Sequence, residues 1–156
     1  MSLIAPADQD KLRAAFNEMT SPVRLLFFTQ TLGCETCPQT RQILDELPPL
    51  SDKISIEEVN LVLEGDKAKQ YGVDRVPAIA LVSVDNGPPD RGAGAPGVIT
   101  DSRIRFVGTP AGYEFISLVQ AVLLVGGRPP SLTGENRKRL AAVNEPVTLQ
   151  VFTTPT

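Results

Sequence analysis

Four short hydrophobic segments in the first 127 residues have the pattern of β-strands. Residues 23–29 are almost continuously apolar and aromatic, which is typical of a buried strand. Residues 54–59 and 103–107 alternate between apolar and polar side chains, as half-buried strands do, and residues 78–82 form another apolar run. The pattern therefore predicts four strands, the last of them at an edge of the sheet or half exposed.

Apolar residues at helical spacing predict a helix before the first strand and another after it, and a short polar helix is expected after the second strand. Asp8 and Asp10 open the first helix. The short helix covers residues 66–71 and ends at Gly72, a residue type that is common just beyond a helix. The buried face of the first helix comprises Leu12, Phe16 and Met19.

The last predicted helix follows the strand at residues 103–107. Thr109 is a typical helix cap, Pro110 fits the first helical position, and the Gly-Gly pair at residues 126–127 ends the helix. The order helix–β–α–β–α–β–β–α predicts an α/β fold with a central mixed β-sheet flanked by helices and an extra N-terminal helix. The buried face of the last helix comprises Phe115, Val119, Val122 and Leu123.

The only two cysteines, Cys34 and Cys37, lie between the strand at residues 23–29 and the helix that begins near Pro38. At the first turn of a helix, unpaired backbone N–H groups and the helix dipole favour an anionic thiolate. A dipole contribution of up to about 2 kcal/mol lowers a thiol pKa by somewhat more than one unit. The spacing therefore predicts a dithiol that cycles to a disulfide, with Cys34 as nucleophile and Cys37 as resolving thiol.

Other interpretations of the pair stay open. A zinc or iron–sulfur site needs more ligands, and the chain has no histidine and no third cysteine, so metal could bind only between two subunits; we predict none in the single chain. A structural disulfide across so short a loop stabilises little, and two buried inert thiols also fit the pattern. The strand at residues 23–29 has no acid to accept the Cys37 proton, and Glu58 is a candidate substitute.

Composition limits the kinds of partner and the cellular compartment that we expect for this protein. A net charge of −3 without a basic run argues against nucleic acid. Residues 1–10 lack the features of a secretory signal, and no stretch approaches 18 consecutive apolar residues. We therefore expect a cytoplasmic protein without nucleic-acid or membrane partners, and in that compartment dithiols are mainly catalytic or redox-sensing.

A helix and strand near the start of the chain recur near its end. The sequence AAFNE at residues 14–18 returns as AAVNE at residues 141–145. The pattern Pro-Val-x-Leu-x-x-Phe-Thr at residues 22–29 returns at residues 146–153. Because both blocks recur in the same order, we interpret them as an internal repeat.

The repeat predicts two units. Residues 1–127 form the first, which carries the C-x-x-C pair. Residues 128–156 supply a connecting helix and the first strand of an incomplete second unit, whose own C-x-x-C is expected just after Thr156. Since the strand at residues 147–152 has no sheet of its own in the first unit, we expect it to be disordered, exchanged between two chains of a dimer, or paired to an available sheet edge.

The order strand, C-x-x-C, helix and then Val76-Pro77 at the start of a later strand resembles the thioredoxin fold. The stretch VGTPAGYEF at residues 107–115 and the repeated unit resemble the glutaredoxin-like protein disulfide oxidoreductases, over nearly the whole chain. This resemblance implies that Pro77 is cis and faces the dithiol, and that the backbone at Val76 pairs with an extended substrate. Arg75 would then lie near the thiols and stabilise a thiolate, with a solvated loop arginine as an equal alternative.

By resemblance, the protein reduces, oxidises or isomerises disulfides of protein substrates without a bound cofactor, and a thioredoxin-reductase-like protein is a candidate electron donor. The alternative is a non-catalytic docking module of a larger tandem redox protein. Flavin-linked peroxiredoxin reductases also begin with tandem thioredoxin-like units, but their first unit usually lacks its cysteines, so the sequence resembles them less.

Two features depart from the family pattern. Glu35 places a carboxylate between the thiols, which disfavours a thiolate and makes the dithiol more reducing, unless it is simply a first-turn acid favoured by the helix dipole. Residues 85–102 contain four glycines and three prolines and are longer than a hairpin needs. We expect them to form an insertion near the edge of the sheet.

Overall fold

The computed structural model describes residues 3–85 and 97–152, and a four-stranded sheet lies at its centre. The spatial order of the strands is β2-β1-β3-β4. β1 runs parallel to β2 and antiparallel to β3, which is antiparallel to β4. The predicted α/β fold with a central mixed sheet is confirmed. The strands are β1 (Val23–Thr29), β2 (Ile54–Asn60), β3 (Ala78–Asp85) and β4 (Val98–Val107).

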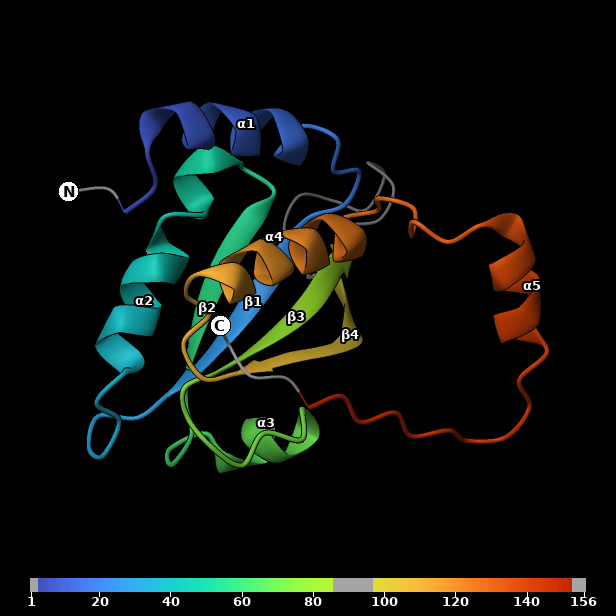
Figure 1. Ribbon diagram of the computed structural model, residues 1–156. Helices are drawn as coiled ribbons and strands as arrows, with labels where there is room; N and C mark the ends of the chain where they lie inside the picture. The colour runs from blue at the N-terminus through green and yellow to red at the C-terminus, as the bar shows by residue number, and fades with distance from the viewer. Residues whose placement is uncertain (1–2, 86–96, 153–156) are drawn as a thin grey trace.

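Helices lie on both faces of the sheet (Figure 1). Three of them, α1 (Pro6–Phe16), α2 (Cys37–Asp45) and α4 (Tyr113–Val125), pack on one face together with the 3-10 turn η1 (Pro48–Leu50). The opposite face is covered by the short helix α3 (Gly65–Gln70). α1 is the extra N-terminal helix that the pattern predicted.

The central strand β1 explains the continuous apolar run in the sequence. Leu25 and Phe27 join the core beneath α1, α2 and α4, whereas Leu26 and Phe28 join the smaller core beside α3. All residues of β1 except Arg24 are buried. A strand that is covered on both faces has no polar side to expose, so its sequence does not alternate.

Two element boundaries differ from prediction at α1 and β4. α1 begins at Pro6, two residues before the predicted acidic opening, and ends at Phe16, so Met19 is buried beyond the helix rather than on it. β4 begins at Val98, five residues earlier than predicted, and pairs with β3 as far as Asp85. Both ends of the predicted insertion over residues 85–102 therefore belong to strands: Asp85 ends β3, and residues 98–102 are the first part of β4. Residues 86–96 lie outside the described part of the chain.

The predicted cap at Thr109 and Pro110 is wrong, because α4 begins at Tyr113. Gly108 and Gly112 have φ angles of +102° and +58°, a left-handed backbone that interrupts a helical path on both sides of Thr109. The C-terminal end of α4 is as predicted, with Gly126 as C-cap and Gly127 at φ +105°.

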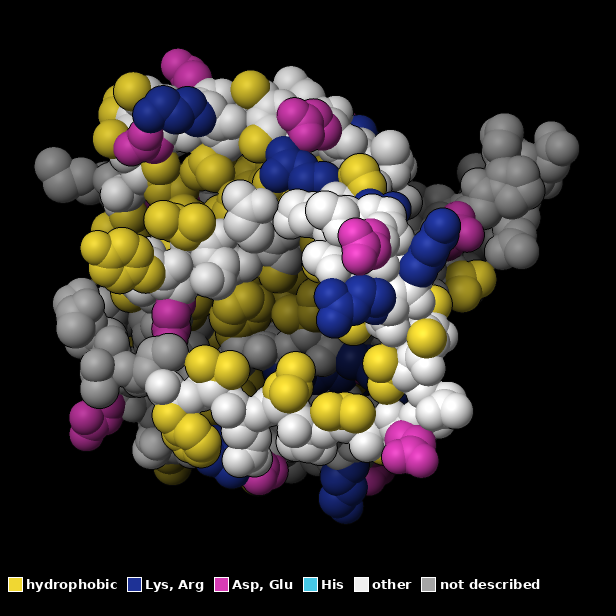
Figure 2. Space-filling model, turned by 45° about the vertical axis from the view of Figure 1, so that its right-hand side comes forward, with side chains coloured by type: hydrophobic (Ala, Val, Ile, Leu, Met, Phe, Trp, Pro, Cys, Tyr) yellow, Lys and Arg dark blue, Asp and Glu magenta, His cyan; other side chains and the backbone are white. Residues whose placement is uncertain are grey.

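Residues 128–152 lie apart from the sheet (Figure 1). They include α5 (Gly134–Ala141), which is capped by Thr133 and has no buried residue. The predicted strand at residues 147–152 is not formed, and its apolar side chains Val147, Leu149, Val151 and Phe152 are exposed. Other parts of the surface also carry hydrophobic side chains, as the face drawn in Figure 2 shows. A strand needs a partner for its backbone groups, and no described strand of the sheet pairs with this segment. None of the helices described is both long and apolar enough to cross a bilayer.

Candidate functional site

The two cysteines form a disulfide at the edge of the sheet where β1 and β2 end. Thr29 and Asn60 are register partners at these two strand ends, and the loop that follows β1 leads directly to the cysteines. The Cα atoms of Cys34 and Cys37 are 5.4 Å apart. Cys37 is the first residue of α2, whereas Cys34 precedes the helix by three residues. Cys37 therefore lies on the first turn of the helix, and Cys34 lies just before it.

The two cysteines differ in exposure. Cys37 is only 5% exposed and belongs to the core beneath α1, α2 and α4. Cys34 is half-buried and packs against the same core from its margin. An incoming disulfide can therefore approach Cys34 more easily than Cys37.

A cis peptide bond joins Val76 to Pro77, as the resemblance implied. Pro77 is buried, and the half-buried Val76 packs against the same core as Cys34. Among the described residues, the backbone N–H and C=O of Val76 have no backbone hydrogen-bond partner. The segment thus offers a free donor and acceptor beside the start of β3.

Arg75 forms an ion pair with its neighbour in the sequence. Its Nε and Nη2 donate to the two carboxylate oxygens of Asp74, at 2.8 and 3.1 Å. Both side chains are exposed, and the hydrogen bond and charge of Arg75 lower the pKa of Asp74. The Asp74 carboxylate therefore offsets the positive charge of Arg75, which was expected to stabilise a thiolate.

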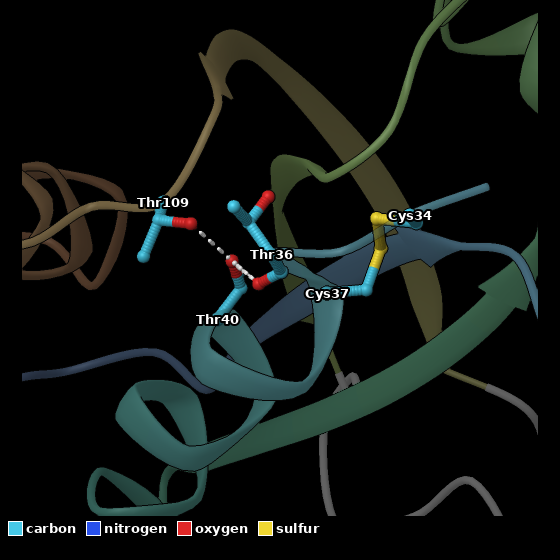
Figure 3. Close-up of a disulfide and its surroundings, with 5 residues drawn as sticks. All are labelled: Cys34, Thr36, Cys37, Thr40 and Thr109. Carbon is cyan, nitrogen blue, oxygen red and sulfur yellow. Dashed lines mark hydrogen bonds between the residues drawn. A yellow bond between two sulfur atoms is a disulfide. The ribbon is translucent and has the colours of Figure 1, made fainter.

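The loop after β4 is the third segment at the site, and its role was not predicted from the sequence. The Gly108 N–H donates to the Pro77 carbonyl at 2.9 Å. The Thr109 hydroxyl lies 2.8 Å from the Thr40 hydroxyl on α2 (Figure 3). The Thr40 hydroxyl in turn donates to the Thr36 carbonyl at 3.0 Å. One signal was present: Thr40 is a polar residue on the buried face of α2, between Cys37 and Leu44.

The described part of the chain places no buried carboxylate at the dithiol. Its only buried polar side chains are those of Thr29 and Thr40. Glu58, the candidate proton acceptor, is exposed and pairs with Arg41 of α2. Glu35 is also exposed. Within residues 3–85 and 97–152, no group of three or more His, Cys, Asp or Glu side chains could hold a metal ion.

Comparison with known proteins agrees with this geometry. No family model matches the sequence. A "Probable Thioredoxin" of Methanothermobacter marburgensis is 36% identical over 98 residues, which make up 62% of this chain and 92% of the relative. The chain belongs to the thioredoxin-fold disulfide oxidoreductases. The relatives and the C-x-x-C pair together support a redox centre of the thiol–disulfide oxidoreductase type.

Longer proteins also contain a segment similar to this thioredoxin-fold chain. An NADH dehydrogenase of Bacillus subtilis is 31% identical over 98 residues, which make up 63% of this chain but only 14% of that relative. A component of the alkyl hydroperoxide reductase of Xanthomonas campestris pv. phaseoli is 31% identical over 128 residues, or 80% of this chain and 19% of the relative.

Two solved structures share the fold. The NTD_N/C domain of the alkylhydroperoxide reductase AhpF from Enterococcus faecalis superposes with a TM-score of 0.73 at 27% identity, covering 91% of this chain and 62% of that one. A protein disulfide oxidoreductase from Aeropyrum pernix gives a TM-score of 0.67 at 22% identity, covering 88% of this chain and 54% of that one. The predicted thioredoxin-like fold is confirmed.

Proposed function

We propose that this chain reduces, forms or isomerises disulfides of protein substrates, with Cys34 as the attacking thiol and Cys37 as the resolving thiol. The observation that carries the proposal is the unequal exposure of a bonded C-x-x-C pair at the start of α2. Cys37 is buried at 5% exposure and Cys34 is accessible. Unpaired N–H groups at the start of α2 would stabilise a Cys34 thiolate.

The proposed reaction has two exchange steps. The Cys34 thiolate attacks one sulfur of a substrate disulfide, forms a mixed disulfide and releases the other substrate sulfur as a thiolate, which takes up a proton. Cys37 then loses its proton to solvent and attacks the Cys34 sulfur, which releases the second substrate thiolate. The substrate gains two electrons and the pair becomes a disulfide. A dithiol reductant must return two electrons and two protons before the next turnover.

We assign substrate binding to Val76 and Pro77. The backbone groups of Val76 have no backbone partner among the described residues, so they are available to pair with an extended chain. Exposed apolar side chains at the same edge of the sheet, including Leu32, Val62 and Leu63, favour a protein over a small charged thiol. Arg75 is proposed to contribute only when its ion pair with Asp74 opens.

A second candidate is a docking module within a longer tandem redox protein. The predicted division of the chain into a first unit over residues 1–127 and the start of a second over residues 128–156 favours this candidate. The chain spans 62% of the AhpF domain structure and far less of the longer relatives. The names of those relatives, an NADH dehydrogenase and part of an alkyl hydroperoxide reductase, favour a reductase as the electron donor. A dimer through residues 147–152 stays a prediction.

Trapping of mixed disulfides tests the assigned roles. The variant Cys37→Ser cannot resolve the first intermediate, so it should accumulate a mixed disulfide with a denatured, disulfide-containing protein such as insulin. The matched variant Cys34→Ser retains only the buried thiol and should accumulate little. Equal trapping by both variants would contradict the assignment, and trapping by neither would favour the docking module.

A further inference from the structure

We propose that Thr109 and Thr40 are positioning residues for the dithiol: their hydroxyl groups form a hydrogen-bond chain that ends on the Thr36 carbonyl and strengthens the backbone donor offered to Cys34. The inference rests on the proposed redox function of the pair. It assigns a role to two side chains that do not touch the reacting sulfur atoms.

The direction of the hydrogen bonds follows from the chemistry of the groups. The Thr40 hydroxyl lies 3.0 Å from the Thr36 carbonyl oxygen and 2.8 Å from the Thr109 hydroxyl. A carbonyl oxygen can only accept, so Thr40 must give its single proton to Thr36. Thr40 then accepts a proton from Thr109. Because the Thr40 side chain is fully buried, at 0% exposure, water cannot replace either partner without a change in packing.

The Thr36 carbonyl accepts two hydrogen bonds from one residue. The Thr40 N–H donates to it at 3.0 Å, and the Thr40 hydroxyl donates at the same distance. This carbonyl shares its peptide unit with the N–H of Cys37. Since the peptide is a resonance-stabilised unit, withdrawal of electron density at the oxygen makes the N–H a stronger donor. Chains of hydrogen bonds strengthen one another by roughly 10–30% per bond.

The strengthened N–H faces the sulfur atoms. The C=O and N–H of a trans peptide point in opposite directions, and the Thr36 carbonyl points toward Thr40. Figure 3 shows the two sulfur atoms on the other side of this first turn. As the first residue of α2, Cys37 has no carbonyl within the helix to accept its N–H. In the reduced protein this N–H is available to the Cys34 thiolate.

The same contacts also connect three segments of the site. Thr40 and Thr109 are 69 residues apart, and the loop that carries Thr109 is bonded through the Gly108 N–H to the Pro77 carbonyl. If the hydroxyl pair had a purely mechanical role, its removal would make the protein less stable but would leave the ionisation of Cys34 in the folded protein unchanged. This difference separates the two roles.

The test compares Thr109→Val, which keeps the shape but removes the donor, with the conservative variant Thr109→Ser. In the full reduced chain, thiolate absorbance near 240 nm is followed against pH. Equilibration with glutathione buffers gives the exchange constant of the pair. We expect Thr109→Val to raise the midpoint of Cys34 ionisation by about 0.3 pH unit, halving the thiolate fraction below the midpoint, because one bond of the chain is lost. Thr109→Ser should match the wild type.

Thr40→Val removes the donor to the carbonyl itself, so it should raise the midpoint further, and the Cys37 amide proton should shift upfield in both valine variants. The amide shift keeps the proposal testable if Thr40→Val is too unstable for titration. An unchanged midpoint and amide shift in Thr109→Val would overturn the proposal, as would a serine variant that behaves like valine. A wild-type dithiol that exchanges with no disulfide would instead refute the proposed function on which the inference rests.

Discussion

Reduction of the Cys34–Cys37 disulfide is predicted to destabilise the protein only slightly. The bond closes a loop of four residues, since the cysteines are three positions apart. The chain-entropy relation gives about 2 kcal/mol for a loop of this length, compared with about 3 kcal/mol for fifteen residues. A bond that serves mainly as a structural staple contributes about 2–5 kcal/mol when it is removed from a small domain.

Part of the stability lost on reduction is offset by the thiolate that forms in the reduced native state. A Cys34 thiolate near the start of α2 is stabilised by the helix N-terminus, by an amount of the order of 1 kcal/mol. We therefore expect the oxidised protein to be more stable by about 1–2 kcal/mol. By thermodynamic linkage, that makes the folded pair about 20–40 mV harder to reduce than the same pair in the unfolded chain, since 30 mV corresponds to about 1.4 kcal/mol.

The assay is urea unfolding of the oxidised and reduced protein at one pH, analysed with a common slope. The double variant Cys34→Ser/Cys37→Ser is the control, because its unfolding should not respond to the reductant. A stability difference above about 4 kcal/mol, or a reduced protein that does not fold, would show instead that the bond is structural.

Three further predictions concern the rest of the molecule. Glu57 lies between Arg24, at 3.0 Å, and Lys67; burial alone would raise its pKa, but the Lys67 and Arg24 contacts together hold the pKa below its ordinary value. The stabilisation is therefore present above the ordinary pKa and is lost as pH falls through the lowered pKa. Glu57→Gln should lower the free energy of unfolding by about 0.5–1 kcal/mol at pH 7 but not at the acid end of a pH series of unfolding curves. Leu81→Ala empties a fully buried site on β3 and should cost about 2–5 kcal/mol in the same assay. Deletion of residues 131–156 removes α5 and a segment that is exposed as far as it is described, so an altered unfolding midpoint would contradict the division into units.

The fold was predictable where local pattern and tertiary environment agree. β1 has the predicted bounds, because a strand covered on both faces needs an unbroken apolar run. α4 does not begin where its cap signal lies, because Thr109 uses its hydroxyl for Thr40 and the glycines on either side take left-handed angles. Residues 147–152 have a strand pattern without a strand, since pairing depends on a partner that the pattern does not contain.

The site was partly predictable for the same reason. The spacing of Cys34 and Cys37 and the position of Pro77 are local signals, and the structure brings these segments to one edge of the sheet. The contact between Thr40 and Thr109 joins residues 69 positions apart. The polar Thr40 on the buried face of α2 was a signal, but nothing in the local sequence identifies its partner. Only the packing of α2 against the loop after β4 makes this hydrogen bond visible.

The reduction potential of the Cys34–Cys37 pair decides whether the pair is a working redox centre or a structural bond. The protein is equilibrated with glutathione buffers of graded composition, and the free thiols are trapped and counted. We expect a potential between about −180 and −270 mV, the range of working thioredoxin-fold oxidoreductases. A value well below roughly −300 mV, or thiols that never exchange, would contradict it and leave the pair a structural bond.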